Sequence, residues 1–203
     1  MFTGIVSELG TVGAVEGTHG GAVFGVDAPA TCVGLTIGDS IAVNGVCLTA
    51  ISVEGGRFTV EAISETLQRT NLGDLKTGSS VDLERPVEVA GGRFDGHVVQ
   101  GHVDGVGVVR RIDAEGSSKR LRISTPPTLA RYLVEKGSVT VDGVSLTITA
   151  VSAVASDEPW FEIALIPFTL DVTVLGQKAV GDRVNLEADI LAKYVERLME
   201  ARG

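Results

Sequence analysis

The chain consists of short apolar runs, rich in β-branched residues, that alternate with polar positions and are separated by glycine-containing turns. Residues 57–63 (Arg-Phe-Thr-Val-Glu-Ala-Ile) show the strict alternation that is typical of a half-buried strand. The dipeptides Asn44-Gly45 and Asp142-Gly143 interrupt two valine-rich runs, where they indicate a tight turn or a bulge. Strands at this spacing predict closed antiparallel barrels.

Four segments carry the pattern of helices instead. Residues 125–137 begin with Thr-Pro-Pro and end at a glycine, which predicts a helix between them. Short helical turns are expected at residues 64–66 and 167–169. Residues 189–202 place apolar side chains on one helical stripe and charged ones on the other face. Such a terminal helix must pack on its own barrel or on copies of itself, and the pattern leaves both open.

The pattern repeats in order along the chain, and an internal repeat fixes the architecture. Residues 40–49 (Ser-Ile-Ala-Val-Asn-Gly-Val-Cys-Leu-Thr) match residues 138–147 (Ser-Val-Thr-Val-Asp-Gly-Val-Ser-Leu-Thr). Residues 66–84 match residues 169–187, and a weaker match links the start of the chain to residues 101–109. Ordered matches at nearly constant offsets indicate two similar domains.

The repeat therefore predicts an all-β chain of two tandem barrels with about six strands each. The N-terminal barrel is expected at residues 1–93, the C-terminal barrel at 94–188 and a C-terminal helix at 189–203. The join Ala90-Gly91-Gly92-Arg93 has the composition of a linker.

Composition narrows the function only by exclusion. The chain has 203 residues and a formal net charge of -9, so binding to a nucleic-acid backbone is disfavoured. The sequence predicts neither a secretory signal nor a membrane span. Cys32 and Cys47 have no metal-ligand spacing, and two cysteines in such a chain favour free thiols. We expect a cytoplasmic protein.

Together these segments resemble the riboflavin synthase family of the lumazine-dismutating type. The matching pieces are the opening Met-Phe-Thr-Gly-Ile-Val, the two Gly-Val-(Cys/Ser)-Leu-Thr blocks, residues 96–105 (Gly-His-Val-Val-Gln-Gly-His-Val-Asp-Gly) and residues 191–198. The likeness covers nearly the whole chain. It implies two Greek-key lumazine-binding barrels, a terminal helix that helps to build a homotrimer, and active sites shared between subunits.

The resemblance also implies the reaction. Two molecules of 6,7-dimethyl-8-ribityllumazine exchange a four-carbon unit and give riboflavin and 5-amino-6-ribitylamino-2,4(1H,3H)-pyrimidinedione, with no cofactor and no metal. This is the last step of riboflavin biosynthesis. Two similar pockets suit a reaction between two copies of one molecule. Which barrel binds the donor, which residue removes the first proton, and whether the chain docks on lumazine synthase stay open.

Positions where the repeats diverge are candidates for chemistry. When the two repeats are aligned, Cys47 corresponds to Ser145, Ile5 to His102, Asn44 to Asp142, and Pro86 to Asp189. The resemblance implies catalytic roles for Cys47, His102, Ser145 and Asp189. A further set is expected to line the pockets: Phe2 (as a cover for a bound ring), Gly4, Ile5, Val6, Ser40, Thr49, Ile63, Thr66, Gly101, Val103, Lys136, Thr147, Ile166 and Thr169.

Simpler interpretations exist for several of these residues. Cys47 could be a small buried hydrophobe, and Asp189 could serve only as the N-cap of the terminal helix. His97 and His102 are not expected to form a metal pair, because a strand would place them on opposite faces, and a lone histidine is more often structural. The resemblance favours a site role for His102 and leaves His97 below it. The competing functions are a non-catalytic lumazine- or flavin-binding protein, a ligand-free two-barrel scaffold, and a flavin-dependent reductase.

Overall fold

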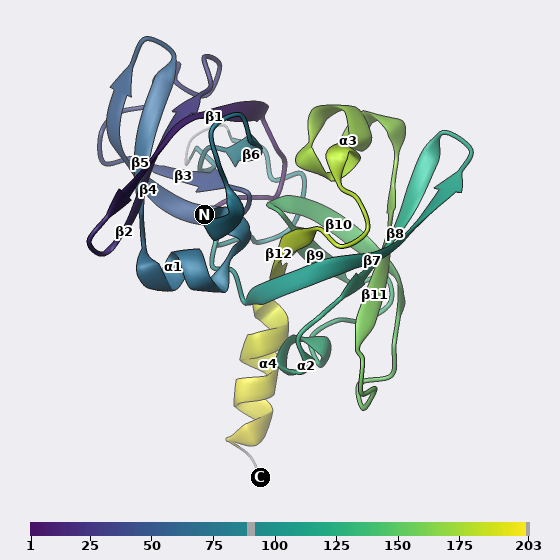
Figure 1. Cartoon of the computed structure of the whole chain (residues 1–203). Coiled ribbons are helices and arrows are strands. Elements are labelled where there is room, and N and C mark those ends of the chain that lie inside the picture. The colour runs from purple at the N-terminus through teal and green to yellow at the C-terminus, as the bar shows by residue number, and fades with distance from the viewer. Residues whose placement is uncertain (89–91, 202–203) are drawn as a thin grey trace.

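A computed structural model describes residues 1–88 and 92–201 and shows two closed antiparallel barrels side by side (Figure 1). The N-terminal barrel has the ring order β1-β2-β5-β4-β3-β6 and comprises β1 (Glu8–Thr18), β2 (Gly21–Asp27), β3 (Ser40–Val43), β4 (Val46–Glu54), β5 (Arg57–Ile63) and β6 (Ser80–Glu84). The C-terminal barrel follows the same path with β7 (Gly105–Glu115), β8 (Ser118–Ser124), β9 (Ser138–Val141), β10 (Val144–Val151), β11 (Trp160–Leu165) and β12 (Arg183–Ala188). The predicted fold of two six-stranded barrels is confirmed; Ala90 and Gly91 of the expected linker lie outside the described residues.

Short helices join the strands. They are α1 (Ser64–Arg69), η1 (Asn71–Asp74), α2 (Pro127–Ala130), α3 (Pro167–Val172), η2 (Val174–Gln177) and α4 (Ile190–Glu200). The turns expected at 64–66 and 167–169 are therefore present as α1 and α3. No helix in the described ranges has the length and apolar character needed to cross a membrane.

The prediction of one helix over residues 125–137 was wrong in length, because α2 ends at Ala130. Leu129 and Leu133 are both buried in the barrel core, which holds this segment against the strands. At Lys136 the chain adopts φ 66, and the Lys136 N–H donates to the carbonyl of Ile148. This reversal leads directly into β9, so the helix cannot continue.

The two Asn-Gly and Asp-Gly turns meet between the barrels. Asn44 and Asp142 have φ values of 46 and 47, and each is followed by a glycine with positive φ. Each dipeptide joins two antiparallel strands as a two-residue hairpin turn. A Cβ atom on Gly45 would lie 2.6 Å from the backbone nitrogen of Gly143, so the contact between the turns requires glycine.

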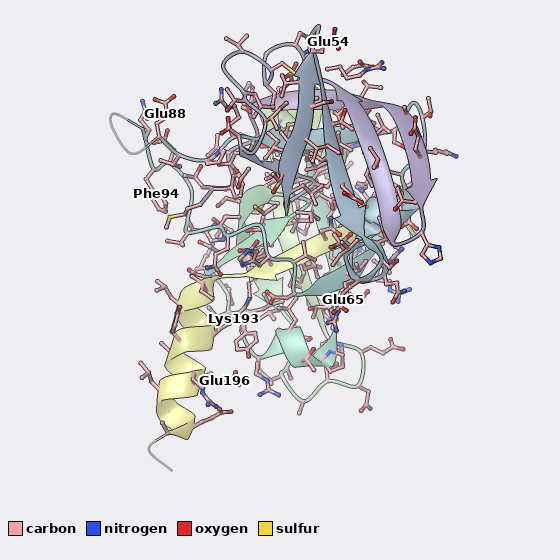
Figure 2. All side chains as sticks on the ribbon, turned by 90° about the vertical axis from the view of Figure 1, so that its left-hand side faces the viewer. Glu54, Glu65, Glu88, Phe94, Lys193 and Glu196 are labelled. Atoms are coloured by element: carbon pink, nitrogen blue, oxygen red, sulfur yellow. The ribbon has the colours of Figure 1, made fainter. Side chains whose placement is uncertain are left out.

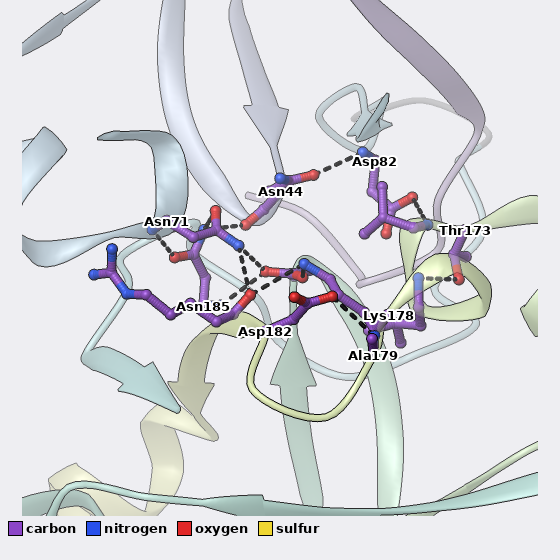
Figure 3. A network of polar contacts seen from close by, with 12 residues as sticks. Asn44, Asn71, Asp82, Thr173, Lys178, Ala179, Asp182 and Asn185 are labelled. Carbon is purple, nitrogen blue, oxygen red and sulfur yellow. Dashed lines mark hydrogen bonds and ion pairs between the residues drawn. The ribbon is translucent and has the colours of Figure 1, made fainter. Parts of the chain in front are cut away.

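A buried polar network surrounds this contact and links the barrels (Figure 3). Asn185 Nδ2 donates to the carbonyl of Asn44 at 2.8 Å and to Asn71 Oδ1 at 2.9 Å. Asn71 Nδ2 donates to Asp142 Oδ1 at 2.7 Å, and Lys178 Nζ lies 2.8 Å from Asp142 Oδ2. Because such groups are costly to bury without partners, the network favours one relative orientation of the barrels.

Asp82 is the residue of this region whose burial costs the most free energy. Asn185 occupies the equivalent position in β12. Asp82 Oδ1 accepts the N–H of Val174 at 2.8 Å, whereas Oδ2 is buried without a hydrogen-bond partner among the described residues. Burial raises the pKa of Asp82 well above its usual value. A raised folded-state pKa means that stability is full below the unfolded pKa of about 3.9 and declines as the pH rises through the folded pKa.

Asp82→Asn is therefore expected to raise the melting temperature at neutral pH. Removing the poorly partnered charge should contribute about 1–3 kcal/mol, or roughly 2–4 °C per kcal/mol. The gain should shrink towards pH 4, which thermal unfolding across the pH range would measure. Asn185→Asp is the control and should lower the melting temperature. An equal gain at every pH would contradict the role of the charge.

The segments that precede β1 and β7 meet each other between the barrels. The N–H of Phe2 donates to the carbonyl of Val99 at 2.8 Å, and the N–H of Val99 donates to the carbonyl of Phe2 at 3.1 Å. Both side chains are buried. This isolated antiparallel bridge joins the equivalent segments of the two repeats and directs each one towards the opposite barrel.

Candidate active site

On the N-terminal barrel, the predicted residues gather around the hairpin of β3 and β4. Ser40 pairs with Thr49, and Cys47 lies on the same side of β4 as Thr49, with Leu48 between them in the core. The carbonyl of Gly101, which comes from the second repeat, accepts the N–H of Cys47 at 2.8 Å. The other residues of this barrel's set are Ile63 at the end of β5, Thr66 in α1, His102, and Val103, which packs on the core.

The C-terminal barrel carries the equivalent cluster. Ser145 and Thr147 lie on β10, and the carbonyl of Gly4, from the first repeat, accepts the N–H of Ser145 at 2.8 Å. Ile5 is exposed beyond this contact, and Val6 packs on the core of this barrel. The rest of the set comprises Lys136 before β9, Ile166 after β11, and Thr169 in α3. Each cluster therefore includes a segment from the other half of the chain.

The contact of residue 4 with Ser145 and the contact of residue 101 with Cys47 both require glycine. Gly4 has φ 79 and Gly101 has φ 76, which is the left-handed region that disfavours side chains. A Cβ atom on Gly4 would lie 2.6 Å from the Cβ of Ser145, and one on Gly101 would lie 2.6 Å from the Cβ of Cys47. Both glycines are thus fixed by the backbone conformation and by the approach of the site side chain.

A hydrogen-bonded histidine distinguishes the C-terminal cluster. His97 Nδ1 lies 2.6 Å from Ser145 Oγ, and His97 Nε2 lies 3.2 Å from Thr140 Oγ1. Burial lowers the pKa of His97, and the charge of Asp189 opposes this effect. A neutral imidazole in this position can accept the proton of the Ser145 hydroxyl, which makes the oxygen more basic.

The N-terminal cluster is apolar at the equivalent place. Cys47 packs against Phe2, Ala42 and Val99 instead of against a histidine. The side chain of Phe2 is 0% exposed, so it lies behind Cys47 and does not match the expectation that it covers a bound ring. The burial follows from the bridge to Val99, which draws the first residues of the chain between the barrels. Both Cys47 and Cys32 are free thiols.

Asp189 and His102 complete the set of proposed catalytic residues. Asp189 is the N-cap of α4, and its Oδ1 accepts the N–H of Leu191 at 3.0 Å. Its influence on the pKa of His97 associates it with the Ser145 cluster. His102 has an exposed side chain next to Gly101. No group of three or more His, Cys, Asp or Glu side chains within residues 1–88 and 92–201 is placed to hold a metal ion.

The sequence analysis favoured His102 over His97, whereas the structure places His97 in contact with Ser145. The repeat could not reveal it, because its counterpart would precede residue 1. The useful signal was the position of His97 four residues before Gly101, in a segment whose equivalent at Gly4 reaches the opposite barrel.

Helix α4 projects away from the two barrels (Figures 1 and 2). Its apolar stripe is exposed to solvent. Its polar side is bound to its own chain: Glu196 Oε1 lies 2.7 Å from Arg131 Nη1, and Glu196 also accepts the hydroxyl of Tyr132. Lys193 Nζ lies 2.5 Å from Asp104 Oδ1. The exposed apolar residues are Leu191, Tyr194, Val195, Leu198 and Met199. This is the reverse of the usual orientation of an amphipathic helix.

Comparison with known proteins supports the repeat and the family. The lumazine binding domain family matches residues 3–86 and again residues 100–189. Riboflavin synthase from Mycobacterium bovis is 51% identical over 205 residues, with 100% of both chains covered. The enzyme from Bacillus subtilis is 40% identical, with 98% of this chain and 90% of the relative covered.

A yeast relative and a solved structure agree with these matches. Riboflavin synthase from Schizosaccharomyces pombe is 43% identical over 99% of this chain and 95% of the relative. The crystal structure of LumP complexed with riboflavin superimposes with a TM-score of 0.82 at 24% identity, covering 93% of this chain and 99% of that chain, and shows the same fold. With two lumazine-binding repeats and full-length relatives of one activity, the chain belongs to the riboflavin synthase family, a family of transferases.

Proposed function

We propose that each barrel of this chain binds one 6,7-dimethyl-8-ribityllumazine, and that the reacting pair forms between neighbouring chains. The family reaction transfers a four-carbon unit from one lumazine to the other and needs two binding sites of one kind. The observation that carries the proposal is the pair of equivalent clusters, Cys47 with Gly101 and Ser145 with Gly4. The barrels of residues 1–93 and 94–188 would then be the two lumazine-binding units.

The arrangement of the pockets supports a site shared between chains. Helix α1 lies at one edge of the N-terminal barrel and α3 at the opposite edge of the C-terminal barrel (Figure 1). These helices carry Thr66 and Thr169, so ligands bound beside them in one chain would lie apart. The exposed stripe of α4, within residues 189–203, offers a surface for a homotrimer that brings unlike barrels together.

The polar C-terminal cluster is suited to moving a proton. The C7 methyl group of the lumazine is acidic, because its anion is delocalised into the ring. Ser145, hydrogen-bonded to His97, would take or return a proton there, and Asp189 would tune His97 through its charge. His102, next to the Cys47 cluster, would exchange protons with the second lumazine.

The rest of each site would orient the rings. Backbone groups of residues 4–6 and 101–103 can recognise the edge of a flat heterocycle, as small-molecule sites commonly do. Ile63 and Ile166 are 62% and 58% exposed and can pack on a ring face. Hydroxyls and one ammonium group are available for the ribityl chains, from Ser40, Thr49, Thr147 and Lys136. Alignment of two reactants can contribute effective molarities of roughly 10⁵ M or more.

Two further parts of the proposal concern the surroundings of the enzyme. The two free thiols support a cytoplasmic location, where thiols stay reduced. Association with lumazine synthase is proposed because such a complex would pass its product directly to this site. Co-elution of the two enzymes in gel filtration tests the association.

The test of the function is to mix the protein with the lumazine alone and to follow the absorption spectrum. We expect two lumazines to be consumed for each riboflavin formed, and a shifted but static spectrum would overturn the proposal.

Ser145→Ala should lower kcat by about 10²-fold or more, because it removes a proton-transfer group. Ser118→Ala, at the start of β8, is the matched control and should leave kcat unchanged.

A further inference from the structure

Glu84, at the end of β6, binds the backbone of residues 3 and 4. These residues belong to the segment that precedes β1 and crosses to the C-terminal barrel. Its Oε1 accepts the N–H of Thr3 at 2.7 Å and the hydroxyl of Thr3 at 3.0 Å. Its Oε2 accepts the N–H of Gly4 at 2.9 Å. Gly4 in turn accepts the N–H of Ser145, so a carboxylate of the N-terminal barrel fixes a residue that contacts the Ser145 cluster of the C-terminal barrel.

Glu187, at the equivalent position of β12, binds the backbone of residues 100–102, which reach from the second repeat to the N-terminal barrel. Its Oε1 accepts the N–H of Gln100 at 2.7 Å, and its Oε2 accepts those of Gly101 at 2.9 Å and His102 at 3.0 Å. Gly101 accepts the N–H of Cys47. A carboxylate of the C-terminal barrel therefore fixes the segment that contacts the Cys47 cluster of the N-terminal barrel.

Both carboxyl groups are held in unfavourable surroundings. Glu84 and Glu187 are 7% and 3% exposed. Burial raises the pKa of each, while the backbone N–H donors oppose the rise. A buried carboxylate is costly unless hydrogen bonds compensate it, and here the donors are backbone groups of the crossing segments. Without the carboxylates, those N–H groups would lose their acceptors between the barrels.

We propose that Glu84 and Glu187 are positioning residues that act crosswise, each holding the wall of the pocket on the other barrel. Glu187 holds Gly101 and His102 against Cys47, and Glu84 holds Gly4 against Ser145. The inference rests on the proposed two-pocket function. It adds that the geometry of each pocket depends on a carboxylate that belongs to the opposite barrel.

The crosswise effect separates positioning from a general contribution to stability. If the carboxylates only stabilise the fold, Glu187→Gln and Glu84→Gln should loosen the molecule alike. If they position the walls, Glu187→Gln should affect Cys47 far more than Glu84→Gln. The reason is that Glu187 holds Gly101, whose carbonyl binds the Cys47 backbone, whereas Glu84 holds Thr3 beside Phe2. An amide is nearly the size of a carboxylate but can present only one oxygen to the several N–H donors.

The experiment measures the alkylation rate of Cys47 by iodoacetamide in the full chain without substrate, with mass spectrometry to locate the label. Gly101 lies close against Cys47, so release of the segment should expose the thiol. We expect Glu187→Gln to raise the rate at Cys47 by about tenfold or more, since charge-assisted hydrogen bonds are lost. Glu84→Gln loosens only the chain next to Phe2, so it should raise the rate by no more than about threefold. Cys32 is the internal reference in both variants.

Equal acceleration in both variants, or none in Glu187→Gln, would overturn the crosswise role. Because no lumazine is present, the labelling result is independent of the two-to-one conversion that tests the function itself. In the kinetic assay, loss of positioning should appear in kcat, with a smaller change in KM.

A measurement on the unchanged protein covers the case in which Glu187→Gln does not fold. Native-state hydrogen exchange should show the amides of Gln100, Gly101 and His102 exchanging at least about a hundredfold more slowly than an open loop. The same protection is expected at Thr3 and Gly4. Exchange at the rate of an open loop at these five amides would contradict the proposal.

Discussion

Gly101→Ala is expected to lower the rate of riboflavin formation by about 100-fold or more. The new Cβ would lie 2.6 Å from the Cβ of Cys47 and 2.9 Å from its backbone nitrogen. The crossing segment must therefore move away from β4, which breaks the 2.8 Å hydrogen bond between Cys47 and Gly101. A displacement of about 1 Å at a reacting site can cost about 10²-fold in rate. Steady-state kcat, followed by flavin absorbance, is the measurement.

Gly116→Ala separates this contact from backbone strain. Gly116 has φ 62 in the hairpin between β7 and β8, and no atom lies within 4 Å of its ideal Cβ. Both alanine variants therefore bear a similar conformational cost, of about 1–2 kcal/mol. Only Gly101→Ala should lose turnover. Full kcat in Gly101→Ala would show that the approach of the segment to Cys47 does not matter for the reaction.

The fold was predictable because it depends on local patterns that the repeat supplies twice. Alternation over residues 57–63 identifies a strand, and the Asn-Gly and Asp-Gly pairs identify hairpin turns. Two copies of one pattern imply two copies of one barrel. The helix over residues 125–137 failed for the opposite reason, because the burial of Leu133 and the backbone bond of Lys136 are tertiary interactions that override a local signal.

The exchange of segments could not be read from the sequence. The repeat assigns residues 1–7 to the first half, yet Gly4 contacts the second barrel, and Gly101 contacts the first. Sequence similarity defines which residues are equivalent but not which barrel they touch. The same exchange explains why the motif did not predict the contact between His97 and Ser145. The two residues become neighbours only when the segment of His97 meets the opposite strands in the folded chain.

Leu198→Glu is expected to dissociate the proposed homotrimer and to lower turnover by about 100-fold or more at low protein concentration. Leu198 is 65% exposed on the apolar stripe of α4. Burying such a side chain in a helix contact is worth about 1.5–3 kcal/mol per copy, and each copy of a symmetric oligomer contributes the same residue. A carboxylate there would have to be buried without a partner, which is strongly unfavourable. Light scattering combined with the kinetic assay would measure both effects.

Arg197→Glu is the control, because it introduces the same carboxylate at the adjacent position on the charged side of the helix. It should leave both the oligomer and kcat intact. If Leu198→Glu gives monomers that retain full turnover, one chain holds a complete active site and the shared site is wrong. If the oligomer persists in Leu198→Glu, the stripe of α4 does not build it. Loss of both together is expected, because in the proposed function the reacting pair of lumazines forms only when a neighbouring chain supplies the second barrel.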